Sequence, residues 1–162
     1  MRSFLGVIVM MSLVLSCDER RVYEMNTDFD SRYWPVSEKP VFEFEVSDTT
    51  VAYNLYANVR NSLDYPYANI FLTWYLQDSA GAQLEKELVR QLLFDEKTGE
   101  PFGESGLGDI YDHRIPLKKD HRFSYAGKYS VVLEHYMRTD TLSGVLAVGL
   151  RVEKSLAENM SP

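Results

Sequence analysis

The sequence has little of the residue types that define several common protein classes. Its 162 residues include one cysteine, nine glycines and six prolines. A single cysteine excludes a disulfide framework and a zinc centre built from several thiolates, and so few glycines and prolines exclude a collagen-like chain. Acidic residues outnumber basic ones by 24 to 17, a formal net charge of −7, which is unsuited to nucleic acid. The composition predicts one acidic, aromatic-rich globular domain with no nucleic-acid partner.

The chain also lacks an apolar run long enough to span a bilayer. Its longest such run covers residues 4–15, which would give about 18 Å of helix against a hydrocarbon core of roughly 30 Å. The run follows the basic start Met1-Arg2. We therefore interpret residues 1–16 as a secretory signal peptide.

The end of this leader is typical of a bacterial lipoprotein. Val14, Leu15 and Ser16 lead directly into Cys17, an arrangement that resembles a lipobox. The thiol of Cys17 would take diacylglycerol as a thioether, and the small Ser16 leaves room for the peptidase. We predict covalent diacylglycerol and an acyl chain such as palmitate at Cys17, and no other cofactor; the alternative is an unmodified cysteine after an ordinary signal peptide. The acidic pair at 18–19 fits either membrane of an envelope, and we expect a lipid-anchored protein of the cell envelope, at the outer membrane rather than the inner one.

Beyond Pro40 the apolar residues recur with a period of two. The pattern covers five segments, residues 42–46, 51–59, 70–76, 129–137 and 146–152. Such alternation gives a strand one buried and one exposed face. Residues 83–94 fit a helix as well as a strand, and we favour a strand because predicted hairpin partners surround them. Many short strands with turns between them favour an antiparallel β-sandwich over a parallel α/β sheet.

These patterns predict an all-β protein with a single antiparallel β-sandwich of the jelly-roll or immunoglobulin-like kind. The sandwich covers residues 41–154 and follows the signal peptide, 1–16, and a lipidated N-terminus and tether, 17–40. A flexible tail, 155–162, ends the chain. Within the sandwich, residues 95–108 contain four glycines and are expected to form a long loop.

Candidate catalytic residues are few and scattered. Asp109, Asp112 and His113 could ligate a metal ion in an envelope hydrolase, although such residues also occur in ordinary loops. The glycine-rich stretch 103–108 lacks the lysine and the strand-to-helix frame of a phosphate-binding loop. No nucleophile elbow occurs, and lipidation would remove the free thiol.

Paired glycosidase carboxylates are a further possibility. The candidates are Glu43, Glu45 and Glu134, but alternate charged residues on a strand usually form its solvated face. We therefore predict no catalytic residue, no metal site and no enzyme activity.

A group of aromatic, amide and basic side chains suggests a binding surface for a partner or a glycan. The residues predicted to form this face are Tyr56, Arg60, Tyr65, Tyr67 and Asn69. Aromatic and amide groups together are typical of partner surfaces. The basic cluster at residues 118–122 is expected to be an exposed turn.

Six short blocks follow the lipobox cysteine in a particular order. They are NVRN (58–61), YPYAN (65–69), GLGDIYD (106–112), GKY (127–129), MR (137–138) and VGLRVEK (148–154). Their order and spacing resemble the gliding-motility lipoprotein GldH family, from Cys17 to Lys154.

The resemblance implies an envelope lipoprotein required for surface gliding. Its partners would be other gliding lipoproteins, envelope motor or secretion components of the linked type IX secretion apparatus, and membrane lipid through Cys17. The resemblance implies no catalytic residues, so Cys17 is the only position of this sequence to which it assigns a function. We expect a non-enzymatic accessory component; the alternative is a surface glycan-binding β-sandwich lipoprotein.

Overall fold

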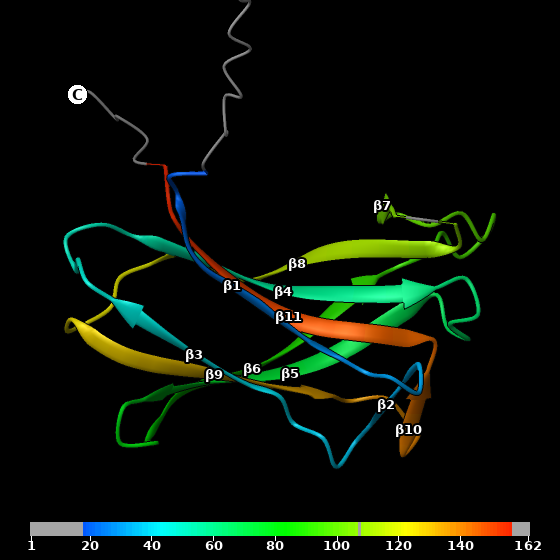
Figure 1. Ribbon diagram of the computed structural model, residues 1–162, viewed down its shortest axis with the longest axis horizontal. Coiled ribbons are helices and arrows are strands. Elements are labelled where there is room, and N and C mark those ends of the chain that lie inside the picture. Colours follow the sequence, from blue (N-terminus) through cyan, green and yellow to red (C-terminus); the bar gives the residue numbers. More distant parts are fainter. Residues whose placement is uncertain (1–17, 107, 157–162) are drawn as a thin grey trace, which may run out of the picture.

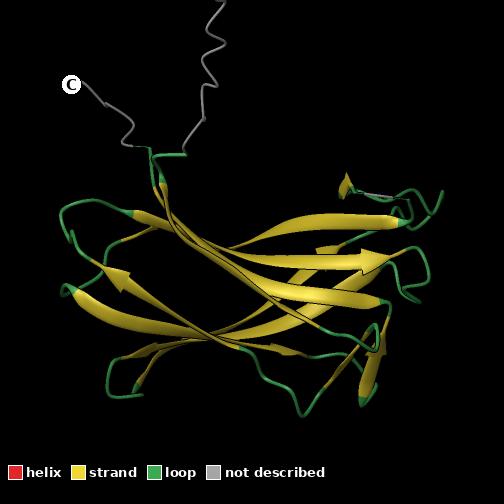
Figure 2. Ribbon diagram, in the orientation of Figure 1, coloured by secondary structure: helices red, strands yellow, loops and turns green. Residues whose placement is uncertain are grey.

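The computed structural model describes residues 18–106 and 108–156. The predicted signal peptide, Cys17 and most of the predicted tail lie outside the described residues. Within the described ranges the chain forms eleven β-strands and no helix (Figure 1; Figure 2). The strands are β1 (Arg21–Asp28), β2 (Tyr33–Pro35), β3 (Val41–Val46), β4 (Tyr53–Ser62), β5 (Asn69–Asp78), β6 (Gln83–Leu92), β7 (Glu104–Ser105), β8 (Ile110–His121), β9 (Gly127–His135), β10 (Thr141–Ser143) and β11 (Val145–Lys154).

The strands build two antiparallel sheets that face each other across one core (Figure 1). The β4 sheet has the order β1-β11-β4-β8-β7, and the β5 sheet has the order β3-β9-β5-β6. A short third sheet, β10-β2, lies at one end of the sandwich. This arrangement confirms the predicted all-β, antiparallel sandwich.

The core follows from the alternation of apolar and polar residues. In β3, Phe42, Phe44 and Val46 are buried while Glu43 and Glu45 are exposed. The largest side chains that are completely enclosed come from several strands: Trp34, Tyr53, Trp74 and Tyr129. Burial of each such side chain contributes about 1.5–3 kcal/mol to folding.

Charged side chains close one open side of the sandwich. Lys118 of β8 contacts Glu85 and lies 3.5 Å from Glu87, both on the edge strand β6. The hydrogen bond to Glu85 raises the pKa of Lys118. Charges that point inward from an edge strand discourage pairing with a second chain, so this ion pair both joins the sheets and protects the edge.

The segment predicted as a tether, 17–40, is instead part of the sandwich from residue 21 onward. β1 pairs with β11 from Arg21↔Glu153 to Asp28↔Ala147, and Trp34 of β2 enters the core. β1 shows no alternation in its sequence because it is an edge strand that is largely exposed on both faces. Pairing with a long neighbouring strand therefore orders a segment whose own composition resembles a linker.

Two other sequence predictions concern the middle of the chain. Residues 83–94 were expected to form a strand, and β6 confirms this. The basic cluster at 118–122 was expected to be a turn, but residues 118–121 are the end of the twelve-residue strand β8. The long loop predicted for 95–108 is present, although it contains the two-residue strand β7 and a bridge between Phe94 and Pro101.

Candidate functional site

The five residues predicted to form a binding face do not share one surface. Tyr56 and Arg60 lie on the outer face of the β4 sheet, where they alternate with buried Leu55, Ala57 and Val59. The other three, Tyr65, Tyr67 and Asn69, belong to the β4–β5 connection and the start of β5. The predicted face is thus divided between a sheet surface and a loop.

Tyr65 is a structural residue. It is buried, and its hydroxyl donates a hydrogen bond to the backbone carbonyl of Asn69 over 2.8 Å. Its ring packs edge-on against Tyr67, with 5.9 Å between centroids. Burial raises the pKa of the Tyr65 hydroxyl, so this side chain stabilises the loop and is not offered to a partner. Among the three residues of the β4–β5 connection and the start of β5, only Tyr67 is exposed.

The most elaborate polar structure on the β4 sheet surrounds Arg151 of β11. Its guanidinium binds Glu24 over 2.8 Å, Glu153 over 2.9 Å, and Asp18. The side chain of Arg151 is only 6% exposed, although it projects from the outer face of the sheet. Three carboxylates from two distant parts of the chain therefore enclose one cation.

The carboxylates respond to this cation in the expected direction. Although burial alone would raise it, the pKa of Glu24 is held below its usual value by hydrogen bonds from Arg21, Asn58 and Arg151. The hydrogen bond from Arg151 likewise lowers the pKa of Asp18. Glu24 and Asp18 are therefore charged at neutral pH, and the cluster fastens the start of the described chain to β11.

Gly149 of β11 allows β1 to pack closely beside β11 in the sheet. A Cβ atom at Gly149 would be 1.8 Å from Oδ1 of Asn26 and 2.5 Å from the carbonyl oxygen of Met25. The amide of Asn58 reaches across this position and donates to Glu24 over 3.1 Å and to Asn26 over 3.4 Å. Side chains of β1 and β4 thus meet across β11, and only a glycine at position 149 leaves room for them.

Two hollows lie on the β4 sheet. One, of about 520 Å³, is lined by Asn58, Arg60, Glu104 and the exposed Phe102. Arg60 forms a two-pronged ion pair with Asp112 there, at 2.8 and 3.2 Å. The second hollow, of about 750 Å³, lies toward the chain ends and includes Arg20, Lys119 and Arg122 in its lining.

A third hollow, of about 500 Å³, lies on the outer face of the β5 sheet. Its lining includes Tyr75, Tyr136 and Leu88, and the last two are more than half exposed. The Tyr75 hydroxyl donates to Glu134 over 2.7 Å, and Lys39 pairs with the same carboxylate over 2.9 Å. Aromatic rings beside fixed polar groups can bind a partner or a sugar.

Sequence reasoning did not single out Tyr75, Tyr136 or Arg151. The sequence does indicate that Tyr75 lies on the outer face, because in the alternating segment 70–76 it takes one of the positions between the buried apolar residues. Arg151 and Glu153 similarly interrupt an apolar strand at alternate positions. Their partners come from the other end of the chain, which no local pattern identifies.

The candidate catalytic groups are not brought together. Asp112 and His113 are neighbours on β8 and so point to opposite faces: Asp112 pairs with Arg60 outside, whereas His113 is buried against Gly103. Across residues 18–106 and 108–156, no group of three or more histidine, cysteine, aspartate or glutamate side chains is placed to hold a metal ion.

Two of the glutamates considered for a glycosidase pair, Glu43 and Glu134, are also far apart. Glu43 lies opposite Ser130 on β9, four residues from Glu134. At about 3.4 Å per residue this is roughly 14 Å, beyond the spacing of roughly 5–9.5 Å that glycosidase carboxylates require. The strands therefore do not place Glu43 and Glu134 as an acid–base pair.

Comparison with known proteins identifies relatives over nearly the whole length. The family model "GldH lipoprotein" matches residues 21–152. A "Gliding motility lipoprotein GldH homolog" of Christiangramia forsetii is 31% identical over 96% of this chain and 99% of its own length. The "Gliding motility lipoprotein GldH" of Flavobacterium johnsoniae is 28% identical over 92% of this chain and 95% of its own.

Solved structures give only distant likenesses. The infectious bursal disease virus VP2 subviral particle aligns with 84% of this chain at a TM-score of 0.41 and 13% identity. The match covers 33% of the viral chain. Dimeric latent PorU from Porphyromonas gingivalis aligns with 85% of this chain and 13% of its own, at a TM-score of 0.36 and 4% identity.

In the described part of the chain, no helix has the length and apolar character needed to cross a membrane. The molecule is an all-β sandwich protein with polar and aromatic hollows on both outer faces. It belongs to the GldH lipoprotein family, as the match over residues 21–152 shows, and the resemblance seen in the sequence is confirmed.

Proposed function

We propose that this protein is a non-enzymatic envelope lipoprotein, anchored through Cys17, that acts as an accessory component of the gliding-motility machinery linked to type IX secretion. The observation that carries the proposal is the family match, which starts four residues after the lipobox cysteine and extends into β11. Both relatives that align over more than nine-tenths of the chain are named as gliding motility lipoproteins or their homologues.

The arrangement of side chains supports an accessory rather than a catalytic role. The polar groups of the β4 sheet are engaged in ion pairs such as Arg151–Glu24 and Arg60–Asp112. The third hollow offers aromatic rings and fixed charges on an open sheet surface. Such a surface suits contact with other gliding lipoproteins or with envelope motor and secretion components. A lipid anchor would keep the domain at high effective concentration beside such partners.

The test is complementation of a deletion strain with variants of the lipobox. Cys17→Ala should leave the fold intact, release the protein from the membrane and abolish both cell movement and secretion. Ser16→Ala is the matched control, because it keeps a small residue before the cysteine and should restore function. Wild-type protein that takes up no radioactive palmitate, or a Cys17→Ala strain that behaves as wild type, would contradict the proposal.

Partners can be identified by affinity purification from crosslinked envelopes. We expect gliding lipoproteins or secretion components to be recovered with wild-type protein. We expect less recovery with Tyr136→Ala, because Tyr136 is 66% exposed beside the third hollow. Tyr67→Ala, an exposed tyrosine of the β4–β5 loop, is the control. Recovery of no envelope partner would argue against an accessory role.

A second candidate function, surface glycan binding, is favoured by the same hollow. Tyr75 and Tyr136 provide aromatic surface, and Glu134 and Lys39 provide polar groups that sugars can contact. Binding to a glycan array that is lost in Tyr136→Ala and kept in Tyr67→Ala would favour this function over protein docking. An array without signal would exclude it.

A further inference from the structure

The residues that directly follow Cys17, the residue that we propose to be lipidated, are bound to the sandwich. Asp18 binds the guanidinium of Arg151. The carbonyl oxygen of Arg20 then accepts a hydrogen bond from the amide of Lys154 over 2.8 Å, and β1 begins at Arg21. Successive Cα atoms are about 3.8 Å apart, so an anchor at Cys17 would be one peptide unit from a residue held by the sandwich.

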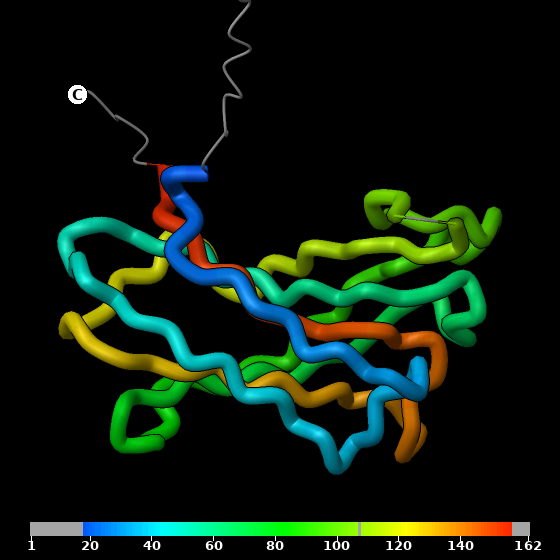
Figure 3. Tube along the Cα trace, viewed as in Figure 1, coloured from blue at the N-terminus to red at the C-terminus, as the bar shows by residue number. Residues whose placement is uncertain are grey.

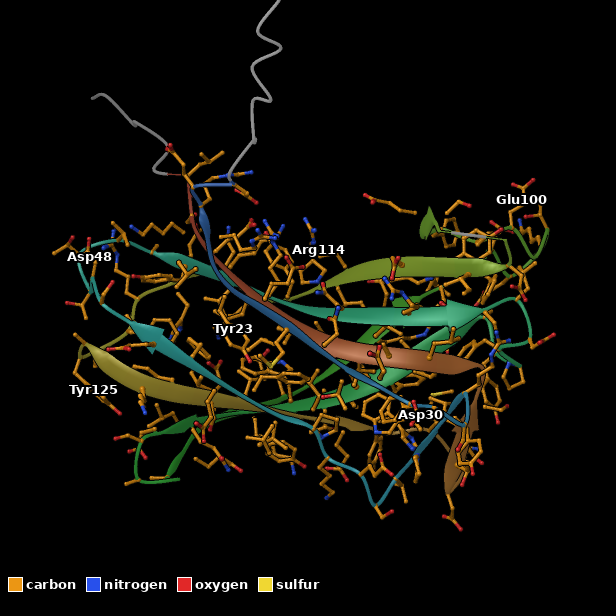
Figure 4. All side chains as sticks on the ribbon, viewed as in Figure 1. Tyr23, Asp30, Asp48, Glu100, Arg114 and Tyr125 are labelled. Carbon is orange, nitrogen blue, oxygen red and sulfur yellow. The ribbon has the colours of Figure 1, made fainter. Side chains whose placement is uncertain are left out.

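This connection determines which end of the sandwich would face the membrane. The blue start of β1 and the red end of β11 lie side by side (Figure 3). The β3–β4 loop, which contains Asp48, is toward the same end, whereas Glu100 lies at the opposite end (Figure 4). A short anchor therefore allows one end of the molecule to approach the bilayer and holds the other away from it.

The hollow of about 750 Å³ at the anchored end carries basic side chains from three separate segments. Arg20 precedes β1, Lys119 belongs to β8, and Arg122 follows β8. All three side chains are exposed. Lys119 and Arg122 form no ion pair with any carboxylate in the described part of the chain, and Nε of Arg20 is 3.9 Å from Asp18.

The two carboxylates in the same lining already have partners. Asp120 accepts a hydrogen bond from the hydroxyl of Ser155, and Glu153 is bound by Arg151. Arg122 is oriented by a hydrogen bond of 2.5 Å from its Nη1 to the carbonyl oxygen of Thr50. The hydroxyl of Ser155 does not neutralise Asp120, so the hollow presents three cations against one carboxylate that forms no ion pair in the described part of the chain, in a protein whose overall charge is −7.

We propose that this end of the sandwich rests on the membrane and that Arg20, Lys119 and Arg122 bind the phosphate groups of anionic lipids. Arginine pairs with phosphate through parallel N–H groups, and lysine acts as a point charge. Each basic residue close to an anionic bilayer strengthens association by about five-fold. The proposal rests on the lipid anchor at Cys17, which it extends by assigning a fixed orientation and a headgroup site.

The test uses the full lipoprotein, purified with its lipid and reconstituted in vesicles. Cys17 is the only cysteine, so one introduced thiol can be labelled with a fluorophore. Thr50→Cys places the label in the hollow, and Thr98→Cys, two residues from Glu100, places it at the far end. Vesicles of phosphatidylcholine, with and without phosphatidylglycerol, carry a quencher on their headgroups.

We expect strong quenching of the label at position 50, more so with phosphatidylglycerol, and little at position 98. Adding Lys119→Ala and Arg122→Ala, which leaves only Arg20 of the three cations, should remove most of the extra quenching seen on anionic vesicles. Lys97→Ala with Arg138→Ala removes the same charge from other exposed positions and should have no such effect.

Equal quenching at the two positions, or no effect of the Lys119 and Arg122 changes, would overturn the proposal. Competition by inorganic phosphate to the neutral-vesicle level would also overturn it, by showing a site for free phosphate. Mass spectrometry of the N-terminal peptide shows separately whether Cys17 is lipidated. A lipidated protein with equal quenching thus refutes the orientation alone, whereas an unlipidated one refutes the orientation and the proposed function together.

Discussion

Replacement of Arg151 by alanine tests the physical basis of the outer face of the β4 sheet. The substitution removes the one cation that contacts Asp18, Glu24 and Glu153. Glu153, whose side chain is only 9% exposed, would then lose its ion-pair partner. Glu24 would keep only Arg21, at 3.1 Å, and Asp18 only Arg20, at 3.9 Å. Repulsion between the carboxylates should loosen β1 from β11.

The magnitude follows from the burial of the cluster. Removing one partner of a buried ion pair costs about 3–5 kcal/mol. Because Asp18 is 35% exposed and water can reach that side, we expect the lower end, about 3 kcal/mol. For a domain of this size each kcal/mol lowers Tm by roughly 2–4 °C, so Arg151→Ala should lower Tm by about 6–12 °C.

The assay is thermal and urea unfolding followed by circular dichroism, with Arg60→Ala as the matched control. Arg60 lies on the same sheet face and also binds a carboxylate, but its side chain is 44% exposed, so its loss should cost about 0–1 kcal/mol. Adding Glu153→Gln to Arg151→Ala should recover part of the lost stability, because it removes one of the repelling charges. Equal destabilisation by Arg151→Ala and Arg60→Ala would refute the reasoning.

Three further outcomes are expected. Gly149→Ala, whose Cβ would lie 1.8 Å from Asn26, should cost about 1–3 kcal/mol and expose β1 to limited proteolysis; wild-type resistance would show that β1 can move aside freely. Burial lowers the pKa values of His113, His121 and His135, so the unfolded chain binds protons more readily than the native one. The free energy of unfolding should then be largest above about pH 6.5 and fall as the pH decreases toward 5. The pKa values of Glu24 and Asp18 are lowered, so the stability that these carboxylates contribute is lost only in more acidic solution. Equal urea midpoints at the two ends of this range would contradict the shifts. Glu85→Thr with Glu87→Thr removes the inward-pointing charges of the edge strand that pair with Lys118 and should promote association through β6, measurable by light scattering; a variant as monomeric as wild type would argue against edge protection.

Part of the fold is readable from the sequence because burial imposes a local signature. β3 and β4 have one face in the core, so Phe42, Phe44 and the alternate residues of 53–59 follow a period of two. β1 lacks this signature because an edge strand need not bury either face. β8 was also missed, although His113, Ile115 and Leu117 alternate with Asp112, Arg114 and Pro116; histidine and proline concealed the pattern.

Of the candidate sites too, only those defined by adjacent residues could be predicted from the sequence. The lipobox at Cys17 is recognised from adjacent residues, because the processing enzymes act on a short linear segment. The face built from Tyr56, Tyr65 and Tyr67 could not be judged locally, since neighbours in sequence point to different surfaces. The partners of Arg151 include Asp18, 133 residues away, and only the antiparallel pairing of β1 with β11 brings them together.

The most direct test of the lipid anchor, on which the proposed function depends, is mass spectrometry of the N-terminal peptide from the native envelope. The account predicts a peptide that begins at Cys17 and carries the mass of diacylglycerol and an additional acyl chain. A peptide with an unmodified Cys17, or one that still contains residues 1–16, would contradict it.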